Sequence, residues 1–339
     1  MKKNGGRNVK TRVVVYGLGP IGAKMVNFLH ERGTFEIAGG VDIAPDKVGK
    51  DLGEIGGLGK KTGVVVESNG RALLERIKPD AVVLTTTSIL ERIKPQVEEI
   101  LESGAAVVST CEELTFPWKT NPGIARDIDA LAKRKNVAVL ATGVNPGFLM
   151  DLLPLVATGV CKKVEDITVY RIQDATSRRI PFQKKVGVGI DVKEFNDRVE
   201  KKTLRHVGLT ESMHMIASRM GWDLERTQDI IEPVIADENF SLQGRTIEKG
   251  YVLGVQQTGK GFAAGRQVLT LVFKAAAGIS ESYDRIVVNG LPPIDMTIKN
   301  GVNGDIATCA MVMNAIPTVL RAKPGLRTMA DIEPVACFS

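Results

Sequence analysis

The sequence predicts an α/β protein in which a doubly wound parallel sheet is joined to a second, α+β domain built on a mostly antiparallel sheet. Through the first 145 residues, short apolar runs alternate with amphipathic segments at the spacing of β-α-β units. A glycine-rich turn joins the first run to the first amphipathic segment. Further along the chain, apolar runs are separated by turns instead of helices, which is typical of antiparallel strands.

The glycine-rich turn is the most informative segment of the chain. The β-branched run Val13–Val15 leads into Gly17-Leu18-Gly19-Pro20-Ile21-Gly22, and apolar residues at helical spacing follow. The first glycine permits a tight strand-to-helix turn, the second lets the backbone approach a diphosphate, and the third lets the helix pack closely against the sheet. The helix N-terminus then offers N–H groups and the positive end of its dipole. We therefore expect these six residues to bind a dinucleotide.

The next strand adds a second part of a dinucleotide site. A strand-like run over 35–41 ends in Asp42, twenty residues beyond Gly22, where a carboxylate accepts the hydroxyls of an adenosine ribose. Strand, glycines, helix, strand and acid together predict a Rossmann-type domain with NAD or NADP as its cofactor. Asp42 favours NAD because its charge would repel a 2′-phosphate, although Lys47 or Arg71 could offset that repulsion.

The rest of the first domain continues the alternation. The patterns predict helices over 45–52, 71–77, 89–101 and 124–135 and strands over 62–67, 80–88, 105–110 and 137–142. Ligands of open α/β sheets bind beyond the carboxyl ends of the strands. We therefore expect residues that follow three of these strands to line the cofactor groove, namely Thr86, Thr87, Ser88, Cys111 and Asn145. A helix cap is an equally good interpretation of Ser88.

The pattern of the chain changes after Asn145. Helices are predicted over 148–160, 192–202 and 210–220, a basic loop over 181–189, and strands over 166–173, 251–256, 267–273, 284–289 and 294–298. An apolar helix over 306–320 is expected to return to the first domain. The predicted boundaries are 1–146 for the dinucleotide-binding domain, with 305–339 returning to it, and 147–304 for a domain that binds substrate and forms a dimer.

Composition narrows the class of protein. At 339 residues the chain can bury a sizeable core, and no apolar run reaches the length of a transmembrane helix. The first twelve residues are basic but lack the apolar stretch of a signal peptide, so a flexible arm is expected there. The net charge of +6 is spread along the chain, which does not indicate nucleic-acid binding. The 4 cysteines lack metal-ligand or disulfide spacing, so we expect a cytoplasmic protein without a metal site.

The candidate catalytic group is a pair of adjacent carboxylates. Glu112 and Glu113 follow the strand over 105–110 and are flanked by Cys, Leu, Phe and Trp side chains. Apolar surroundings raise the pKa of a glutamate toward neutrality, which suits a general base or a group that holds an ammonium. A cap or a solvated surface position is the alternative. Successive residues of an extended chain point to opposite sides, so one of the two is expected to act, and we favour Glu113.

Polar groups elsewhere supply candidates for substrate binding. Asn145, beside the expected nicotinamide position, could bind the nicotinamide amide or the substrate, although asparagine is also an ordinary turn residue. Polar and cationic side chains of the second domain could contact a substrate carboxylate, namely Arg171, Gln173, Arg178 and His206. Each of these taken singly is also a common surface residue.

Four segments resemble one known family. Tyr16–Gly22, Ser109–Trp118, Ala141–Asp151 and Arg179–Gly187 resemble the 2,4-diaminopentanoate dehydrogenase family, which includes the native amine dehydrogenases. The dinucleotide domain of that family is similar to that of dihydrodipicolinate reductase. The resemblance runs through nearly the whole chain. Where the diaminopentanoate enzymes carry Arg-Thr-Gln-Gly-Val-Gly, this chain has Phe182–Gly187, a form closer to the branch that acts on simple amines.

The resemblance implies an activity. It implies NAD(P)-dependent oxidative deamination of an amine to a ketone or aldehyde, and the reverse reductive amination with ammonia. It also implies a homodimer and a catalytic glutamate that falls on Glu113 or Glu112.

Two other functions stay open. An imine or carbonyl reductase of the dihydrodipicolinate reductase type needs a cationic group at the end of the fifth strand, where this chain has acids. A module that senses a dinucleotide without turnover needs no buried carboxylates, and no helix-turn-helix is evident in the sequence.

Overall fold

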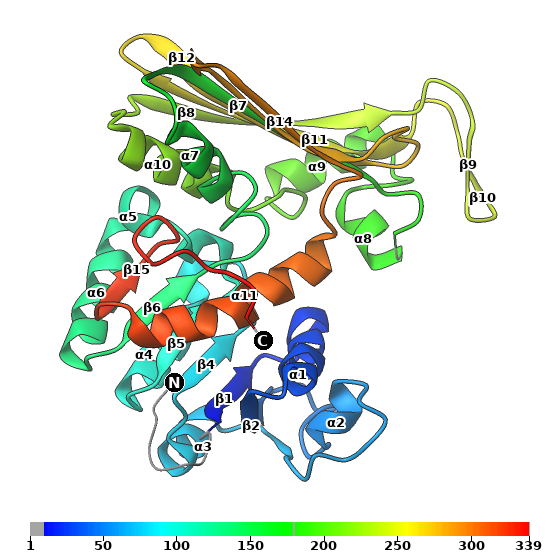
Figure 1. Cartoon of the computed structure of the whole chain (residues 1–339). Coiled ribbons are helices and arrows are strands. Elements are labelled where there is room, and N and C mark those ends of the chain that lie inside the picture. Colours follow the sequence, from blue (N-terminus) through cyan, green and yellow to red (C-terminus); the bar gives the residue numbers. More distant parts are fainter. Residues whose placement is uncertain (1–9, 179, 339) are drawn as a thin grey trace. The chain divides into compact units, whose positions relative to one another are not determined.

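The chain is described by a computed structural model that covers residues 10–178 and 180–338. It forms two compact units, one made of Met1–Phe148 together with Gly304–Ser339 and the other of Leu149–Asn303. Figure 1 traces the chain through both units in sequence colours. Most of the expected basic arm, residues 1–9, lies outside the described residues.

Within the described residues, the first unit contains a parallel sheet of seven strands. The strand order is β15-β6-β5-β4-β1-β2-β3, and every neighbouring pair is parallel. The strands are β1 (Thr11–Tyr16), β2 (Phe35–Val41), β3 (Val66–Glu67), β4 (Ala81–Leu84), β5 (Ala106–Ser109), β6 (Ala138–Ala141) and β15 (Gly325–Arg327). The order reverses direction at β1, which lies between β2 and β4. The predicted doubly wound, Rossmann-type sheet is therefore confirmed.

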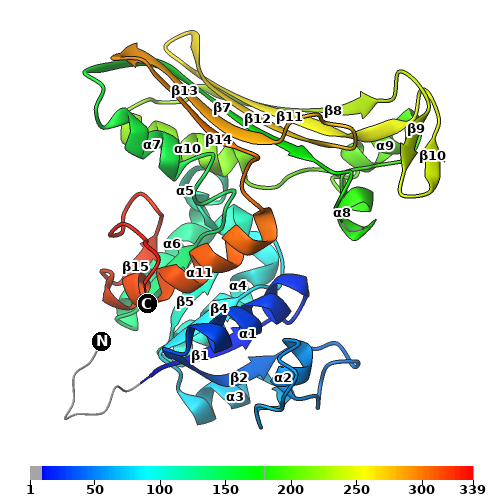
Figure 2. The ribbon, with the colours of Figure 1, turned by 45° about the vertical axis from the view of Figure 1, so that its right-hand side comes forward.

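Helices cover both faces of this sheet, as Figures 1 and 2 show. They are α1 (Pro20–Arg32), α2 (Leu52–Ile55), α3 (Gly70–Ile77), α4 (Leu90–Glu102), α5 (Pro117–Thr120), α6 (Pro122–Arg134) and α11 (Gly304–Arg321), with the 3-10 turn η1 (Glu112–Leu114). Side chains of α3, α4 and α6 share one hydrophobic core with the strands. On the opposite face, α1 and α11 pack side by side. The chain thus returns after the second unit to complete the first.

Differences from the predicted elements of this unit are local. The helix predicted over 45–52 is instead a turn, and α2 begins only at Leu52. The Asp51 carboxylate accepts hydrogen bonds from Gly53 N at 2.7 Å and Thr62 N at 2.8 Å, so this loop is organised around a side chain and not around helical spacing. Of the strand predicted over 62–67, β3 contains two residues. The short β15 has too few residues for a recognisable pattern and forms by pairing with β6.

The second unit contains, in the part that the structure describes, a sheet of six strands in the order β14-β13-β7-β12-β11-β8. The strands are β7 (Lys163–Asp174), β8 (Arg226–Ile235), β11 (Val252–Ala263), β12 (Arg266–Ala276), β13 (Tyr283–Leu291) and β14 (Ile294–Lys299), beside a hairpin of β9 (Phe240–Leu242) and β10 (Arg245–Ile247). β7 and β12 pair in parallel, and the other neighbouring pairs are antiparallel. The predicted mostly antiparallel sheet is confirmed.

The helices of this unit lie on one face of its sheet (Figures 1 and 2). They are α7 (Leu152–Thr158), α8 (Ile180–Lys185), α9 (Val192–Glu200) and α10 (Leu209–Met220). A Cβ built on Gly259 of β11 would lie 3.2 Å from Met213 and 3.4 Å from Leu209, so α10 packs directly on that face. On the other face, half-buried side chains such as Tyr170 of β7 stand opposite Val272 of β12.

One prediction for this unit is wrong, and one strand has no counterpart in the predictions. The loop predicted over 181–189 begins inside helix α8. Buried Gln183 donates hydrogen bonds from Nε2 to the carbonyl oxygens of Ala175 and Arg178, each at 3.0 Å, and so draws the segment into a compact turn. β8 lies at the sheet edge and exposes polar residues such as Glu232, so its hydropathy pattern is weak.

A search of the described helices finds none with the length and hydropathy that a membrane span requires. Among the same residues, His, Cys, Asp and Glu side chains do not gather in groups of three or more that could hold a metal ion. The cysteines are free thiols, of which Cys111 and Cys309 are buried.

Candidate active site

The glycine-rich turn between β1 and α1 has the shape that a diphosphate needs. Gly17 adopts a φ of +91°, and a Cβ on this residue would lie 2.7 Å from Thr86 Cγ2. A Cβ on Gly22 would lie 1.9 Å from the carbonyl oxygen of Gly17, so helix and turn meet at backbone distance. A Cβ on Gly19 would meet no atom within 4 Å. The turn is therefore closed at its first and third glycines and open beside the second, where a diphosphate approaches.

The first turn of α1 supplies donors for an anion. Pro20 has no N–H, and Ala23 N already donates to the carbonyl oxygen of Gly19 at 2.9 Å. The donors of this turn are therefore the N–H groups of Ile21 and Gly22, and the turn carries no acidic side chain. With the positive end of the helix dipole, these donors suit a diphosphate. The residues present thus fit the dinucleotide that the fold implies.

Asp42 follows β2 and is held by several donors. Its Oδ2 accepts hydrogen bonds from Leu18 N at 2.7 Å and Lys47 Nζ at 3.1 Å, and its Oδ1 accepts one from Ala44 N at 2.9 Å. Partial burial raises the pKa of this carboxyl group, but the hydrogen bonds from Ala44, Leu18 and Lys47 outweigh burial, and the pKa is lowered. The ionised carboxylate ties the end of β2 to the glycine-rich turn.

Hydroxyl side chains follow β4 at the same edge of the sheet. Thr85 Oγ1 donates to the carbonyl oxygen of Gly17 at 2.6 Å, which links the end of β4 to the glycine-rich turn. Thr86 is exposed, while Thr87 and Ser88 are half-buried. The structure thus brings these predicted residues beside the turn, with Thr85 as the residue that makes the link.

One of the two acids after β5 closes the start of α4. The N-cap of α4 is Ile89, which makes no side-chain cap, so the alternative that Ser88 caps this helix is wrong. Instead, Glu113 Oε2 accepts a hydrogen bond from Leu90 N at 2.8 Å, and Glu113 N donates to the carbonyl oxygen of Ser88 at 3.3 Å. Glu113 therefore joins the loops that follow β4 and β5.

The neighbours of Glu113 are fixed by the 3-10 turn and the core. Glu112 begins η1, is half-buried, and accepts a hydrogen bond on its backbone carbonyl from Thr115 Oγ1 at 2.7 Å. Cys111 packs in the hydrophobic core, and burial together with the charges of both glutamates raises the pKa of its thiol. The Cys111 side chain is therefore a protonated core group, which leaves its backbone to contact a cofactor.

Asn145 follows β6 at this edge as well. It is partly exposed and joined to Pro146 by a cis peptide bond. The preceding Val144 N donates to Thr308 Oγ1 of α11 at 3.3 Å, so α11 supports the loop. The loops after β1, β4, β5 and β6 thus place the predicted residues of the first unit at the carboxyl edge of one sheet.

In the second unit, Arg171 belongs to a buried ion pair. Its Nη1 donates to Asp284 Oδ1 at 2.7 Å and its Nη2 to the carbonyl oxygen of Val302 at 3.1 Å. Val302 N in turn donates to Asp284 Oδ2 at 2.7 Å. The pair thereby clamps the backbone at Val302, just before the chain leaves this unit. No sequence signal pairs the two residues, because their positions differ by 113.

His206 is an uncharged, packed side chain. Its ring lies 4.5 Å from the ring of Phe273, measured between centroids. Burial, together with the positive charges of Lys185, Arg171 and Arg205, lowers the pKa of His206 to about 3. The imidazole is therefore neutral at physiological pH and stands among cations.

The remaining predicted residues of this unit lie near Arg171. Gln173 is buried, and its Nε2 donates to the carbonyl oxygen of Ile172 at 3.1 Å. Arg178 lies with its guanidinium carbon 4.3 Å from the ring centroid of Phe182, and its charge acts on Arg171. Sequence positions far apart thus meet in one electropositive region of the second unit.

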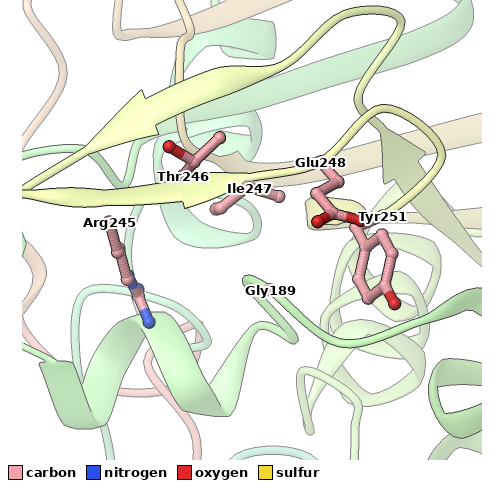
Figure 3. A pocket seen from close by; sticks show the side chains of 6 residues that line it. All are labelled: Gly189, Arg245, Thr246, Ile247, Glu248 and Tyr251. Carbon is pink, nitrogen blue, oxygen red and sulfur yellow. The ribbon is translucent and has the colours of Figure 1, made fainter.

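A cavity of about 250 Å³ lies elsewhere in the second unit (Figure 3). Its lining residues are Gly189, Arg245, Thr246, Ile247, Glu248 and Tyr251. Arg245 Nη2 donates to Gln183 Oε1 at 2.7 Å, which attaches the β9–β10 hairpin to α8. None of the site residues predicted from the sequence lines this cavity.

The fold and the carboxyl edge of the first sheet define the class of protein. A glycine-rich turn that only glycine can form, an open helix N-terminus and an ionised acid after the second strand are the parts of a nicotinamide dinucleotide site. The chain is accordingly a dehydrogenase that uses a nicotinamide cofactor.

The chain belongs to the 2,4-diaminopentanoate dehydrogenase family. The family's model of the 2,4-diaminopentanoate dehydrogenase C-terminal domain matches residues 148–338. The 2,4-diaminopentanoate dehydrogenase of Acetoanaerobium sticklandii is 33% identical over 337 residues, which cover 95% of this chain and 93% of that protein. An amine dehydrogenase of Streptomyces virginiae is 22% identical over 94% of this chain and 95% of its own length.

A solved structure shows the same fold. The amine dehydrogenase from Mycobacterium smegmatis matches with a TM-score of 0.85 and 23% identity, over 97% of this chain and 98% of that one. The predicted family and the prediction of an oxidoreductase that acts on an amine group are confirmed by these relatives.

Proposed function

We propose that the protein catalyses the NAD(P)-dependent oxidative deamination of an amine to a ketone or aldehyde, and the reverse reductive amination with ammonia. The names of its relatives support this reaction. The observation that carries the proposal is the position of Glu113, a carboxylate anchored at the edge of the sheet that also carries the glycine-rich turn. An acid at this place suits a cationic amine substrate.

Glu113 is proposed to hold the substrate ammonium and to accept a proton from it. A bound nicotinamide takes up the hydride in deamination and supplies it in the reverse direction. The resulting imine is hydrolysed by a water molecule that gives a proton to the same carboxylate, and ammonia leaves as the carbonyl product forms. The hydrogen bond from Leu90 N fixes one carboxylate oxygen and thereby orients the other. Glu112 is the alternative for this role.

The second unit is proposed to contact the substrate through Arg178 and His206. Their electropositive surroundings suit a carboxylate, the group that ends 2,4-diaminopentanoate, for which the Acetoanaerobium relative is named. Arg171 and Gln173 are instead proposed to support this region, because their side chains already have partners in the sheet. Asn145 is proposed to contact the nicotinamide amide or the substrate amine.

We further propose a cytoplasmic homodimer that prefers NAD. Free cysteines are typical of a reducing compartment. The uncovered face of the second sheet, with Tyr170 and Val272 at its centre, suits a second copy of the same surface. Asp42 keeps its charge next to the expected ribose and so favours the 2′-hydroxyl of NAD.

The first experiment measures oxidation of NADH and NADPH with ammonia and a panel of carbonyl compounds, including the keto acid related to 2,4-diaminopentanoate. Oxidation that needs both ammonia and a carbonyl identifies an amine dehydrogenase. Oxidation without ammonia identifies a carbonyl or imine reductase. Tight cofactor binding without any turnover identifies a sensing module.

Glu113→Gln and Glu112→Gln separate the two acids. The amide oxygen of glutamine can still accept the hydrogen bond from Leu90 N, so Glu113→Gln keeps the start of α4 intact. We expect Glu113→Gln to lower turnover by a factor on the order of 10² or more, the usual scale for a general base, with the cofactor dissociation constant unchanged. A loss confined to Glu112→Gln would transfer the role to Glu112.

A further inference from the structure

The Asp42–Lys47 pair lies where the fold brings the ribose end of a dinucleotide. The Lys47 ammonium is 3.1 Å from Asp42 Oδ2, and the two side chains are 25% and 11% exposed. Asp42 cannot easily move, because Leu18 N and Ala44 N hold both of its oxygens. Lys47 is tied only at its backbone, where its N–H donates to the carbonyl oxygen of Ala44 at 2.9 Å.

The two members of the pair therefore differ in mobility. The carboxylate is fixed by backbone donors, while the ammonium stands at the end of a four-carbon stem whose bonds rotate. A fixed acid on its own would exclude a 2′-phosphate by charge repulsion. A cation within hydrogen-bond distance of that acid cancels much of the repulsion and can also pair with the phosphate.

The neighbouring residues are consistent with a nucleotide at this place. Ile43, directly after Asp42, exposes 82% of its surface, which is unusual for a large apolar side chain unless something flat covers it. The other cations nearby in sequence have acids of their own, since Lys50 pairs with Glu54. Lys47 is thus the cation that Asp42 engages in the described ion pairs.

We propose that Lys47 adapts the Asp42 site to both nicotinamide dinucleotides. Its ammonium pairs with Asp42 when the ribose carries a 2′-hydroxyl, and it turns onto the 2′-phosphate when that group is present. This inference rests on the proposed dinucleotide-dependent function. It predicts a modest preference for NAD with retained binding of NADP, in place of strict selection.

Calorimetric titration with NADH and NADPH tests the inference without turnover. For the wild type we expect the two dissociation constants to lie within about tenfold of each other, because a partly exposed charge pair accounts for roughly 1.4 kcal/mol. Lys47→Met should raise the ratio of the NADPH to the NADH constant by on the order of tenfold or more, and this increase should shrink at high salt. Asp42→Asn should shift the ratio in the opposite direction.

Lys50→Met is the matched control, since it removes a lysine of the same turn that pairs with Glu54. We expect its ratio to equal that of the wild type, and thermal unfolding of each variant checks the fold. A wild-type ratio in Lys47→Met would overturn the role of Lys47 while leaving the dehydrogenase proposal in place. A wild type that binds neither dinucleotide would overturn both.

Discussion

At the scale of single residues, packing decides the charge of a titratable group. Histidine in an unfolded chain has a pKa of about 6.5. In the folded protein the ring of His206 lies against Phe273 and among Lys185, Arg171 and Arg205, which lowers its pKa to about 3. The imidazole therefore serves as a neutral polar group, and a role as proton donor at neutral pH does not fit it.

The lowered pKa of His206 makes stability depend on pH in a defined direction. The unfolded chain binds a proton at this residue below about pH 6.5, whereas the folded chain does so only near pH 3. The stability contributed by the neutral ring is complete above pH 6.5 and is lost as the pH falls toward 3, at no more than about 1.4 kcal/mol per pH unit. Denaturant unfolding of the wild type and His206→Gln between pH 7.5 and 4.5 measures this term.

In these titrations we expect His206→Gln to lose less stability than the wild type on acidification. Nuclear magnetic resonance gives an independent reading, because the His206 ring signals should not shift between pH 5 and 8. A titration midpoint near 6.5 for this ring would contradict the packing that the structure describes.

At the scale of elements, the first strand, turn and helix depend on how closely their backbones approach. Gly22 lies in α1, yet a Cβ at this residue would lie inside contact distance of the Gly17 carbonyl oxygen. Gly19 has a φ of −64° and a ψ of −170°, which other residues can adopt, and open space lies beside it. The two glycines are therefore required for different reasons, one for folding and one for the ligand.

Alanine substitutions separate these two roles. Gly22→Ala should destabilise the protein by about 2 kcal/mol or more, because its methyl group meets backbone atoms that cannot shift freely. Gly19→Ala should melt like the wild type but weaken dinucleotide binding on the order of tenfold, because its methyl group occupies the space that a diphosphate needs. Thermal unfolding and cofactor titration measure the two effects. Unchanged affinity in Gly19→Ala would place the diphosphate elsewhere.

At the scale of the whole molecule, the second sheet presents a face that its own helices do not cover (Figures 1 and 2). Tyr170 stands opposite Val272 on one side and Arg285 on the other, and Thr168 and Val287 form the next row. Such a mixed face, half-buried and self-complementary about a two-fold axis, is suited to an isologous contact.

Val272→Glu tests the proposed homodimer. A new carboxylate in the centre of the face would face its own copy across a two-fold contact, and like charges there should shift the protein from dimer to monomer. Light scattering after size-exclusion chromatography measures the mass. Thr246→Glu, at an exposed position of β10, is the control and should stay dimeric. A wild type that is monomeric across the concentration range refutes the dimer.

Much of the fold and part of the site could be predicted from the sequence because the signals are local. Alternation of apolar runs and helical spacing predicts the parallel sheet, and the spacing from Gly17 to Asp42 predicts the dinucleotide turn. α8 and β8 escape this reading, since the first depends on the buried amide of Gln183 and the second is a polar edge strand. Their formation depends on partners remote in the sequence.

The sequence by itself determined which chemistry the chain carries: glycines for a diphosphate, an acid for a ribose and a pair of glutamates after a buried strand. Only the tertiary structure decided what each side chain is engaged with. It attached Glu113 to the N-terminus of α4, set Lys47 against Asp42 and gave Arg171 to Asp284. The reason is physical, because residue type and spacing fix local backbone preferences, whereas hydrogen bonds and ion pairs depend on distances that exist only once the strands are assembled.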